Sequence, residues 1–493
     1  MPATPVHATL VWFRLDLRLS DHPALHQAAR RGPVIPVYID EDASGSGRNG
    51  NEWAPGAASR WWLHHSLASL DADLRARGVR LILRRGDPLA VLRDLIRETG
   101  AEAVHWSRRY EPALDLRDRK IAQALRGDGV EVEAFASALL FEPESIRTQT
   151  GGPYQVFTPY WRACLAASEP LPPLPELERI QAPEAWPDSL DLRALDLLPH
   201  IAWAGGLAET WRPGSQGARA LLGDRLDAGL NAGLRAYASD RDTPAAEGTS
   251  RQSPHLHFGE IGVREIWAAV QGRLDAGDGD AAGRASLLAY QRQLGWREFA
   301  HHLLVHFPRT PVEPLRSGFA AFPWRRDAAG LCAWQRGRTG YPYVDAGMRQ
   351  LWATGWMHNR VRMAAASFLV KHLLIPWQDG ARWFWDTLVD ADLAQNTLGW
   401  QWVAGCGADA APYFRIFNPV TQGERFDPEG AYIRRWVPEL ARLQGKWIHR
   451  PWEAPASALN AAGLVLGGDY PLPVVDHALA RARALAAYQT FRD

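Results

Sequence analysis

The chain has 493 residues, 46% of them hydrophobic and 22% charged, and its 55 basic residues balance its 55 acidic ones. This length predicts more than one domain, and the apolar content excludes a disordered chain. We find no apolar run long enough to span a membrane and no secretory signal. The three widely spaced cysteines, Cys164, Cys332 and Cys406, exclude a four-cysteine metal site. We therefore expect no metal site, no membrane and a cytoplasmic location.

The first 135 residues alternate apolar runs with amphipathic stretches. The apolar runs predict buried parallel strands at residues 8–13, 34–39, 79–83, 103–106 and 130–135. Helical spacing lies between them, at residues 22–31, 57–77, 88–99 and 115–126. This alternation predicts a doubly wound parallel sheet, an α/β domain over residues 1–135. No GxGxxG motif follows the first strand, so an ordinary dinucleotide site is not supported there.

The rest of the chain predicts a linker and then a helical domain. Residues 170–200 are rich in proline and leucine, and we assign 136–209 to the linker. From residue 210 to residue 493, helical spacing dominates, for example at 286–305, 346–374 and 382–390. The 23 tryptophans are concentrated in this second half. Most of them should pack in the core, but indoles are also easily oxidised.

Residues 390–402, DADLAQNTLGWQW, carry the strongest chemical signal. Asp390 and Asp392 are two apart, Asn396 follows, and Trp400 and Trp402 flank one glutamine. Two acids beside indoles, without metal ligands nearby, are ill suited to hydrolysis. They suit the binding of a hydrogen-bonding ring system near electron donors, although a surface acid pair followed by core tryptophans is the simpler alternative.

Four further motifs share the chain with this one. They are LVWFRLDLRLSDHPAL (10–25), EGTSRQSPHLHFGE (247–260), GWMHNRVRM (355–363) and DAAPYFRIFNPVTQGERFD (409–427). Together the motifs resemble the photolyase/cryptochrome family of flavoproteins, over nearly the whole chain and least between 165 and 210. The likeness is greatest to the photolyases of cyclobutane pyrimidine dimers, with segments similar to plant cryptochromes.

This resemblance implies an all-α FAD-binding domain. Hydroxyls and free main-chain N–H groups at a helix start suit a pyrophosphate, and an Arg–Asp pair beside an amide suits a reduced flavin. By resemblance, Arg362 pairs with Asp390, Asp392 bonds the pyrimidine end of the ring, and Asn396 faces N5, where plant cryptochromes carry Asp. The full predicted set is Tyr237, Thr249, Ser250, Arg251, Gln252 (usually Leu in the family), Ser253, Arg297, Asn359, Arg362, Asp390, Asp392 and Asn396.

The resemblance also implies an electron relay and a lesion pocket. Trp334, Trp377 and Trp400 match a three-tryptophan chain from the surface to the flavin. Trp296 and Trp402 would stack against a flipped-out pyrimidine dimer, and Gln293, Asn359 and Met363 would complete the pocket. Many photolyases have Glu at the Gln293 position. His358 precedes Asn359, where (6-4) photolyases carry a catalytic His, so we assign His358 a structural role.

The sequence thus predicts light-driven repair of UV-damaged DNA by a monomer. The predicted DNA contacts are Arg241, Arg360, Arg415, Gln422 and Arg425. A second antenna chromophore, methenyltetrahydrofolate or a deazaflavin, is implied by the family, but Ala113 and Leu114 replace the Asn–Glu pair expected in a folate site. The alternative function is a cryptochrome photoreceptor. A nicotinamide-dependent flavoprotein would need a second nucleotide motif, which we do not find.

Overall fold

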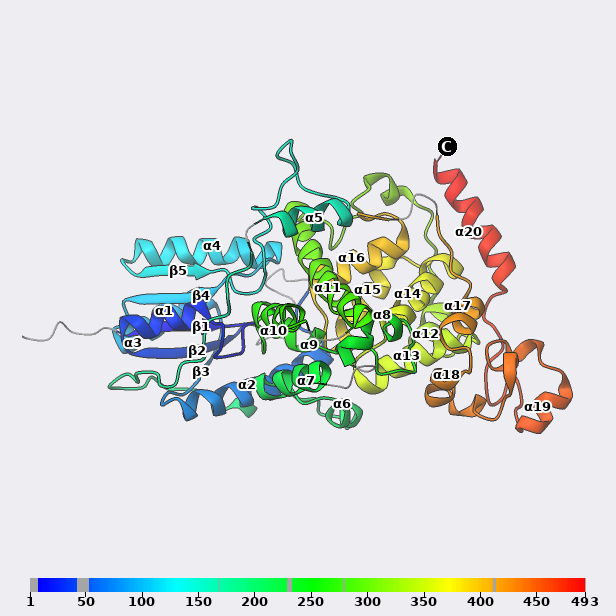
Figure 1. The fold of residues 1–493 in the computed structure, drawn as a ribbon, viewed down its shortest axis with the longest axis horizontal. Helices are drawn as coiled ribbons and strands as arrows, with labels where there is room; N and C mark the ends of the chain where they lie inside the picture. The colour runs from blue at the N-terminus through cyan, green and yellow to red at the C-terminus, as the bar shows by residue number, and fades with distance from the viewer. Residues whose placement is uncertain are drawn as a thin grey trace, which may run out of the picture.

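The computed structural model describes residues 8–41, 53–167, 169–227, 233–277, 280–410 and 414–492. An α/β region occupies one end of the molecule and a larger helical region the other, with the C-terminal helix α20 on the outer side of the helical region (Figure 1). None of the described helices is long and apolar enough to cross a membrane.

The α/β region is one parallel sheet of five strands, as the sequence predicted. The strands are β1 (Thr9–Phe13), β2 (Val34–Asp40), β3 (Ile82–Arg85), β4 (Ala103–Ser107) and β5 (Glu131–Phe135), in the order β3-β2-β1-β4-β5. The connecting helices are α1 (Pro23–Arg31), α2 (Ala57–Ala76), α3 (Pro88–Thr99) and α4 (Pro112–Gly127). The order reverses between β1 and β4, and crevices that bind ligands commonly form at such a point.

Both faces of this sheet are covered, which explains why its central strands are continuously apolar. Val11 and Phe13 pack with residues of α1 and α2, whereas Leu10 and Trp12 pack with residues of α3 and α4. The strand β5 lies at an edge, and its pattern differs, because Val132 is buried while Glu131 and Glu133 are exposed.

The segment that we assigned to the linker contains some regular structure. Helix α5 (Phe157–Ala166) packs against the helical region, and α6 (Gly205–Thr210) ends the segment after a short 3-10 turn, η1 (Leu192–Leu195). Between α5 and η1 the described chain has neither helix nor strand. It lies along the α/β region, where Leu174 O accepts from Asp21 N and Ile180 N donates to Arg77 O.

The rest of the described chain is helical, apart from one isolated bridge between Leu466 and Tyr470. The helices are α7 (Ser215–Asp227), α8 (Tyr237–Asp240), α9 (Ser253–His257), α10 (Val263–Asp275), α11 (Ala281–His306), α12 (Ala328–Gln335), α13 (Pro342–Thr354), α14 (Asn359–Ser367), α15 (Trp377–Thr387), α16 (Leu393–Ala404), α17 (Pro419–Phe426), α18 (Ala431–Trp436), α19 (Ala456–Ala462) and α20 (His477–Arg492). Short 3-10 turns are η2 (Gly233–Ala236), η3 (Ser317–Ala321), η5 (Pro438–Leu440), η6 (Gly445–Ile448) and η7 (Pro451–Glu453).

One predicted helical stretch, 346–374, is broken in the structure. Gly355, at φ +66°, ends α13 in the left-handed conformation that favours glycine. His358 then caps α14, because its Nδ1 accepts from Arg360 N at 3.2 Å. A π-helical turn, η4 (Phe368–His372), extends α14. The interruption matters because it brings Asn359 to the start of a helix.

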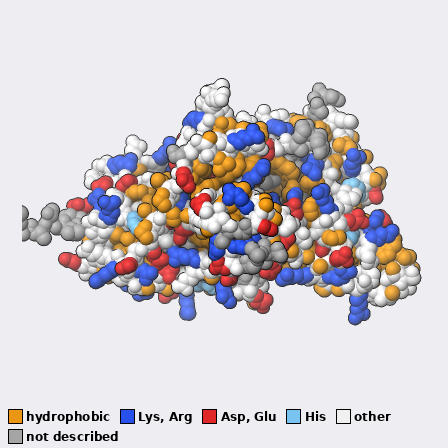
Figure 2. All heavy atoms as spheres, in the orientation of Figure 1, with side chains coloured by type: hydrophobic (Ala, Val, Ile, Leu, Met, Phe, Trp, Pro, Cys, Tyr) orange, Lys and Arg blue, Asp and Glu red, His pale blue; other side chains and the backbone are white. Residues whose placement is uncertain are grey.

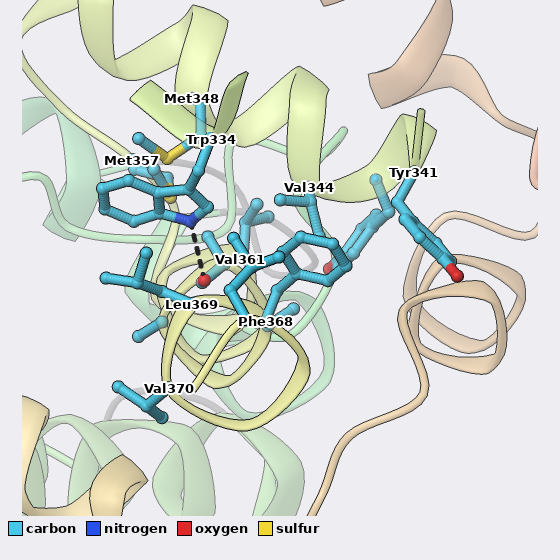
Figure 3. Close-up of a cluster of buried hydrophobic side chains, with 14 of the residues drawn as sticks. Trp334, Tyr341, Val344, Met348, Met357, Val361, Phe368, Leu369 and Val370 are labelled. Atoms are coloured by element: carbon cyan, nitrogen blue, oxygen red, sulfur yellow. Dashed lines mark hydrogen bonds between the residues drawn. The ribbon is translucent and has the colours of Figure 1, made fainter. Parts of the chain in front are cut away.

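The largest core lies under α13, α14 and α16. Figure 3 shows Trp334 between Met348, Met357 and Leu369, with its Nε1 pointing to Ala365 O at 2.9 Å. This packing fixes α14 and α16, the two helices that carry the residues of DADLAQNTLGWQW and GWMHNRVRM.

Candidate functional site

Arg362 and Asp390 form a buried ion pair, as the sequence predicted. The Arg362 Nη2 atom donates to both carboxylate oxygens, at 2.9 and 3.1 Å, and its Nε donates to Met357 O at 2.6 Å. Ser253 Oγ donates to Asp390 Oδ2 at 2.7 Å. One carboxylate therefore joins α9, α14 and the approach to α16, three segments far apart in sequence.

Asp392 is the N-cap of α16 and lies near two histidines. Its Oδ1 accepts from Gln395 N at 2.9 Å, while Oδ2 lies 3.7 Å from His257 Nδ1 and 3.6 Å from His301 Nε2. Burial alone would raise the pKa of Asp392, but His301, His257 and Arg297 outweigh it and hold that pKa far below its usual value. Asp392 is thus a permanent anion next to rings that can donate hydrogen bonds. Neither histidine was predicted, although His257 lies within the motif SPHLHFGE.

Helix α16 presents its aromatic residues on different sides. Trp400 is buried in the main core, whereas Trp402 is half-buried and donates through Nε1 to Asp409 O at 3.1 Å. Residues two apart on a helix differ in direction by about 200°, which accounts for the separation. Asn396 is half-buried, and its Nδ2 donates to Ala381 O at 3.1 Å.

The segment 249–253 leads into the short helix α9. Gln252 is 1% exposed and its Nε2 donates to Ala218 O at 3.0 Å, so its side chain is a structural tie. Arg251 has φ +53° and lies 5.3 Å over the Trp356 ring. Thr249 and Ser250 are half-buried. Tyr237 is buried edge-on against Tyr290, with ring centroids 5.4 Å apart.

The three tryptophans of the predicted relay lie in one hydrophobic core cluster. Trp334 and Trp400 lie 6.2 Å apart between ring centroids, and a Cβ on Gly380 would approach Trp400 Cη2 to 2.1 Å. However, Trp334, Trp377 and Trp400 are only 0, 2 and 2% exposed, so the expectation that this trio reaches the surface is wrong. Trp324, which the sequence reading missed, is half-buried and packs against the same core.

The predicted pocket residues come from three helices in mutual contact. Trp296 on α11 and Trp402 on α16 are half-buried, and α16 packs against both α11 and α14. Phe157 of α5 stacks on Trp296 with ring centroids 3.7 Å apart and an interplanar angle of 8°, so Phe157 covers one face of the indole. Asn359 is exposed near Met363 Sδ, and Gln293 Nε2 reaches Ala289 O at 3.5 Å. Figure 2 shows hydrophobic side chains at the surface over α5, α11 and α16, bordered by Lys and Arg.

Most of the residues predicted to contact DNA lie close to one another around Asp242 and Phe426. Asp242 binds Arg360 through two hydrogen bonds, at 2.9 and 2.7 Å, and lies 3.5 Å from Arg241. Arg360 and Arg425 both lie about 5 Å from the Phe426 ring. Gln422 is on the same helix, α17, whereas Arg415 is exposed beside Phe417. The residues 411–413, within the motif around Arg415, lie outside the described residues.

A small polar hollow opens between the two regions. Arg14 and Asp16 follow β1, and Tyr110 and Glu111 follow β4, so the hollow lies where the strand order reverses. His301, Arg297 and Asp392 line the helical side. Ala113 and Leu114, at the positions where a folate-binding Asn–Glu pair was expected, lie on α4 and do not line it.

The residues present fit the flavin that the sequence predicted. Buried polar atoms without a partner among the described residues include Gln252 Oε1 and His257 Nδ1, at the two ends of the helix that begins with Ser253, and Trp400 Nε1, on the helix that Asp392 caps. Unsatisfied buried polar atoms are costly, so such a group calls for a ligand or water. An anionic carboxylate, a cationic Arg362 and amide donors also match a ring with acceptors at one edge and N–H donors at another.

The comparison with known proteins supports the same kind of cofactor-binding domain. Residues 9–178 match the family model for DNA photolyase, and 290–490 match that for the FAD binding domain of DNA photolyase. The chain is 50% identical, over 97% of both proteins, to a deoxyribodipyrimidine photo-lyase of Agrobacterium fabrum. It is 40% identical to Cryptochrome-1 of Arabidopsis thaliana, over 96% of this chain and 69% of that protein.

The crystal structure of a bacterial class III photolyase from Agrobacterium tumefaciens superposes on this chain with a TM-score of 0.94. The two chains are 49% identical, and the match covers 99% of this chain and 98% of the other. The chain therefore belongs to the photolyase/cryptochrome family.

Proposed function

We propose that this protein repairs UV-damaged DNA by splitting cyclobutane pyrimidine dimers in light, with reduced FAD as its cofactor. The observation that carries the proposal is the joining of Ser253 to Arg362 and Asp390 beside the anionic Asp392. Arg362, Asp390 and Asp392 all lie within the residues that match the FAD-binding domain. When bound, FAD supplies the light-excited electron and takes it back after the cyclobutane ring has opened.

The chain's own residues hold and orient the cofactor in this proposal. Arg362 would face the flavin while Asp390 and Met357 O keep its guanidinium in place. Asp392 would accept from the N–H of the pyrimidine edge, and Asn396 would present its amide to N5. Segment 249–253 would bind the pyrophosphate through Thr249, Ser250 and main-chain N–H groups.

The dimer would enter between α11, α14 and α16. Trp402 and the face of Trp296 opposite Phe157 would stack on the flipped bases, and Met363 and Asn359 would line the pocket. Gln293 can still donate and accept hydrogen bonds, although it lacks the charge that Glu would supply. Phosphates would contact Arg241, Arg360, Arg415, Gln422 and Arg425.

Electrons for photoreduction would pass through the core indoles. Trp400 and Trp334 are neighbours, and Trp377 starts the helix that packs on α16. The route would leave the protein through Trp324, a half-buried indole that packs against the core containing the three tryptophans. We also propose a monomeric, cytoplasmic protein; all three cysteines are free, which suits a reducing compartment.

A second candidate function, blue-light signalling, is favoured by the 40% identity to two cryptochromes of Arabidopsis thaliana. The hollow where the sheet order reverses would suit an antenna chromophore in either case, because ligands commonly bind there. The 50% identity to a photo-lyase leads us to prefer repair.

One assay separates the two functions. Purified protein is photoreduced without oxygen and mixed with an oligonucleotide that contains one thymine dimer, in light and in darkness. We expect the 260 nm absorbance to recover only in light. A Trp402→Ala variant that retains its flavin should lose this recovery. A yellow, photoreducible protein with no light-dependent recovery would instead support the photoreceptor.

A further inference from the structure

Three side chains at the edge of the sheet lie together on the face covered by α1. His105 of β4 is paired in register with Glu133 of β5, and Glu131 lies two residues before Glu133 on the same side of the strand. One ligand atom from each of the three residues lies within 4.8 Å of the other two. This cluster is far from the residues of the proposed flavin site, and it contains no cysteine, so cysteine spacing gives no sign of it.

His105 is the unusual member of this cluster. Its side chain is fully buried, its Nδ1 lies 3.4 Å from Ala24 O, and its Nε2 has no hydrogen-bond partner among the described residues. With the Nδ1 proton directed at a carbonyl, the lone pair is on Nε2. A backbone carbonyl that fixes the second ring nitrogen is the usual support of a metal-binding histidine. A buried ring nitrogen without a hydrogen-bond partner calls for a ligand or water.

The two glutamates differ in how freely they could coordinate an ion. Glu133 is exposed and no ion-pair partner is found for it in the part of the chain that the structure describes. Glu131 Oε1 accepts from Arg31 Nη1 at 2.7 Å, with both side chains partly in solvent. An exposed ion pair of this kind is weak, and the glutamate can rotate away from it.

We propose that His105, Glu131 and Glu133 bind a divalent transition-metal ion, of which Zn²⁺ is the expected representative. One imidazole and two carboxylates are suitable Zn²⁺ ligands, and water would complete the shell. Mg²⁺ should bind poorly, because it prefers oxygen ligands in an octahedral shell. The ion would join the edge strand β5 to β4 in place of the Arg31–Glu131 pair.

The test is calorimetric titration of the full-length, flavin-loaded protein with ZnCl₂ after treatment with a chelator. We expect one site that is lost, or weakened by about tenfold or more, in Glu133→Gln, an exposed position at which the fold should be unaffected. Glu102→Gln, an exposed acid just before β4, is the matched control and should bind as the parent does. MgCl₂ should give no comparable heat.

The Arg31→Gln substitution should change Zn²⁺ affinity in the opposite direction. Removing the competing guanidinium should tighten Zn²⁺ binding by up to about fivefold, which a merely structural role for Glu131 would not produce. Zn²⁺ should also raise the unfolding temperature of the parent but not of Glu133→Gln. The proposal is overturned if the parent binds no Zn²⁺, or if Glu133→Gln and Glu131→Gln keep the parent's affinity and stoichiometry, since the ion is then held by other residues.

Discussion

Arg362 Nη2 lies 2.9 Å from Asp390 Oδ2, and the same oxygen accepts from Ser253 Oγ. The Asp390 side chain is only 4% exposed. Replacing Arg362 with Leu should therefore leave a buried, unpaired carboxylate and lower the free energy of unfolding by about 3 kcal/mol. Urea unfolding measures this loss, and flavin content should fall with it. Arg415→Leu, at an exposed arginine, is the control and should change stability little.

The double variant Arg362→Leu with Asp390→Asn should recover much of the lost stability, because the unpaired charge is gone. An Arg362→Leu protein as stable as the parent would contradict the importance of this pair.

Trp400→Phe should slow photoreduction at least about tenfold, because it removes the relay indole packed on Trp334, while repair by chemically pre-reduced protein continues. Flash photolysis and steady illumination measure the rate of photoreduction. The thymine-dimer assay measures repair by the pre-reduced protein. Comparing the photoreduction rates of Trp324→Phe and Trp334→Phe then shows which indole connects the relay to the protein surface. If Trp324→Phe leaves photoreduction intact, the half-buried indole is not the exit.

Glu298 is fully buried, and Leu140 N and Phe141 N both donate to its Oε2. Burial raises the pKa of Glu298 to about 7, although Arg297 and these two N–H groups partly oppose it. A raised folded-state pKa contributes stability below the unfolded value of about 4.5, and that contribution is lost as pH rises through 7. Glu298→Gln should therefore stabilise the protein at pH 8 relative to pH 5, by up to about 3 kcal/mol.

Thermal unfolding of the parent and Glu298→Gln at both pH values tests this difference. Equal stability of the two proteins at pH 8, with equal pH dependence, would exclude a role for Glu298 titration.

His358 should make the protein sensitive to acid. Its Nδ1 caps α14, which requires a neutral ring, and burial lowers the pKa of His358 to about 4. A lowered folded-state pKa gives stability that is present above about 6.5 and lost as pH falls from 6.5 towards 4. His358→Asn keeps a side-chain cap but cannot titrate. We expect its unfolding temperature to fall less than the parent's between pH 7 and pH 5.

Two glycines should respond in opposite ways to alanine. A Cβ on Gly380 would lie 2.1 Å from Trp400 Cη2, whereas one on Gly399 meets nothing within 4 Å. Gly380→Ala should cost about 1–3 kcal/mol through overpacking and displace Trp400. Gly399→Ala, in the middle of α16, should stabilise the protein by about 1 kcal/mol. Denaturant unfolding measures both changes.

Sequence patterns predicted some features of this protein better than others. The central strands were predicted because buried parallel strands are largely apolar. The helical spacing over 346–374 does not show the break at Gly355, whereas the start of a helix at Asn359 was expected and is observed. Burial could not be read from motif matches, which is why Trp334 was taken as part of a surface route while Trp324 was overlooked. The His105–Glu133 pair depends on strand register, which no local pattern specifies.

The two hydrogen bonds from Arg360 to Asp242 bear on how a chain of zero net charge could associate with a polyanion. The guanidinium is already neutralised by an internal carboxylate, so an arriving phosphate must replace that carboxylate. Association would then be an exchange of partners, and fewer counterions would leave the nucleic acid than the number of nearby arginines implies. In the absence of DNA, Asp242 would neutralise Arg360 and so reduce the attraction of this surface for other anions.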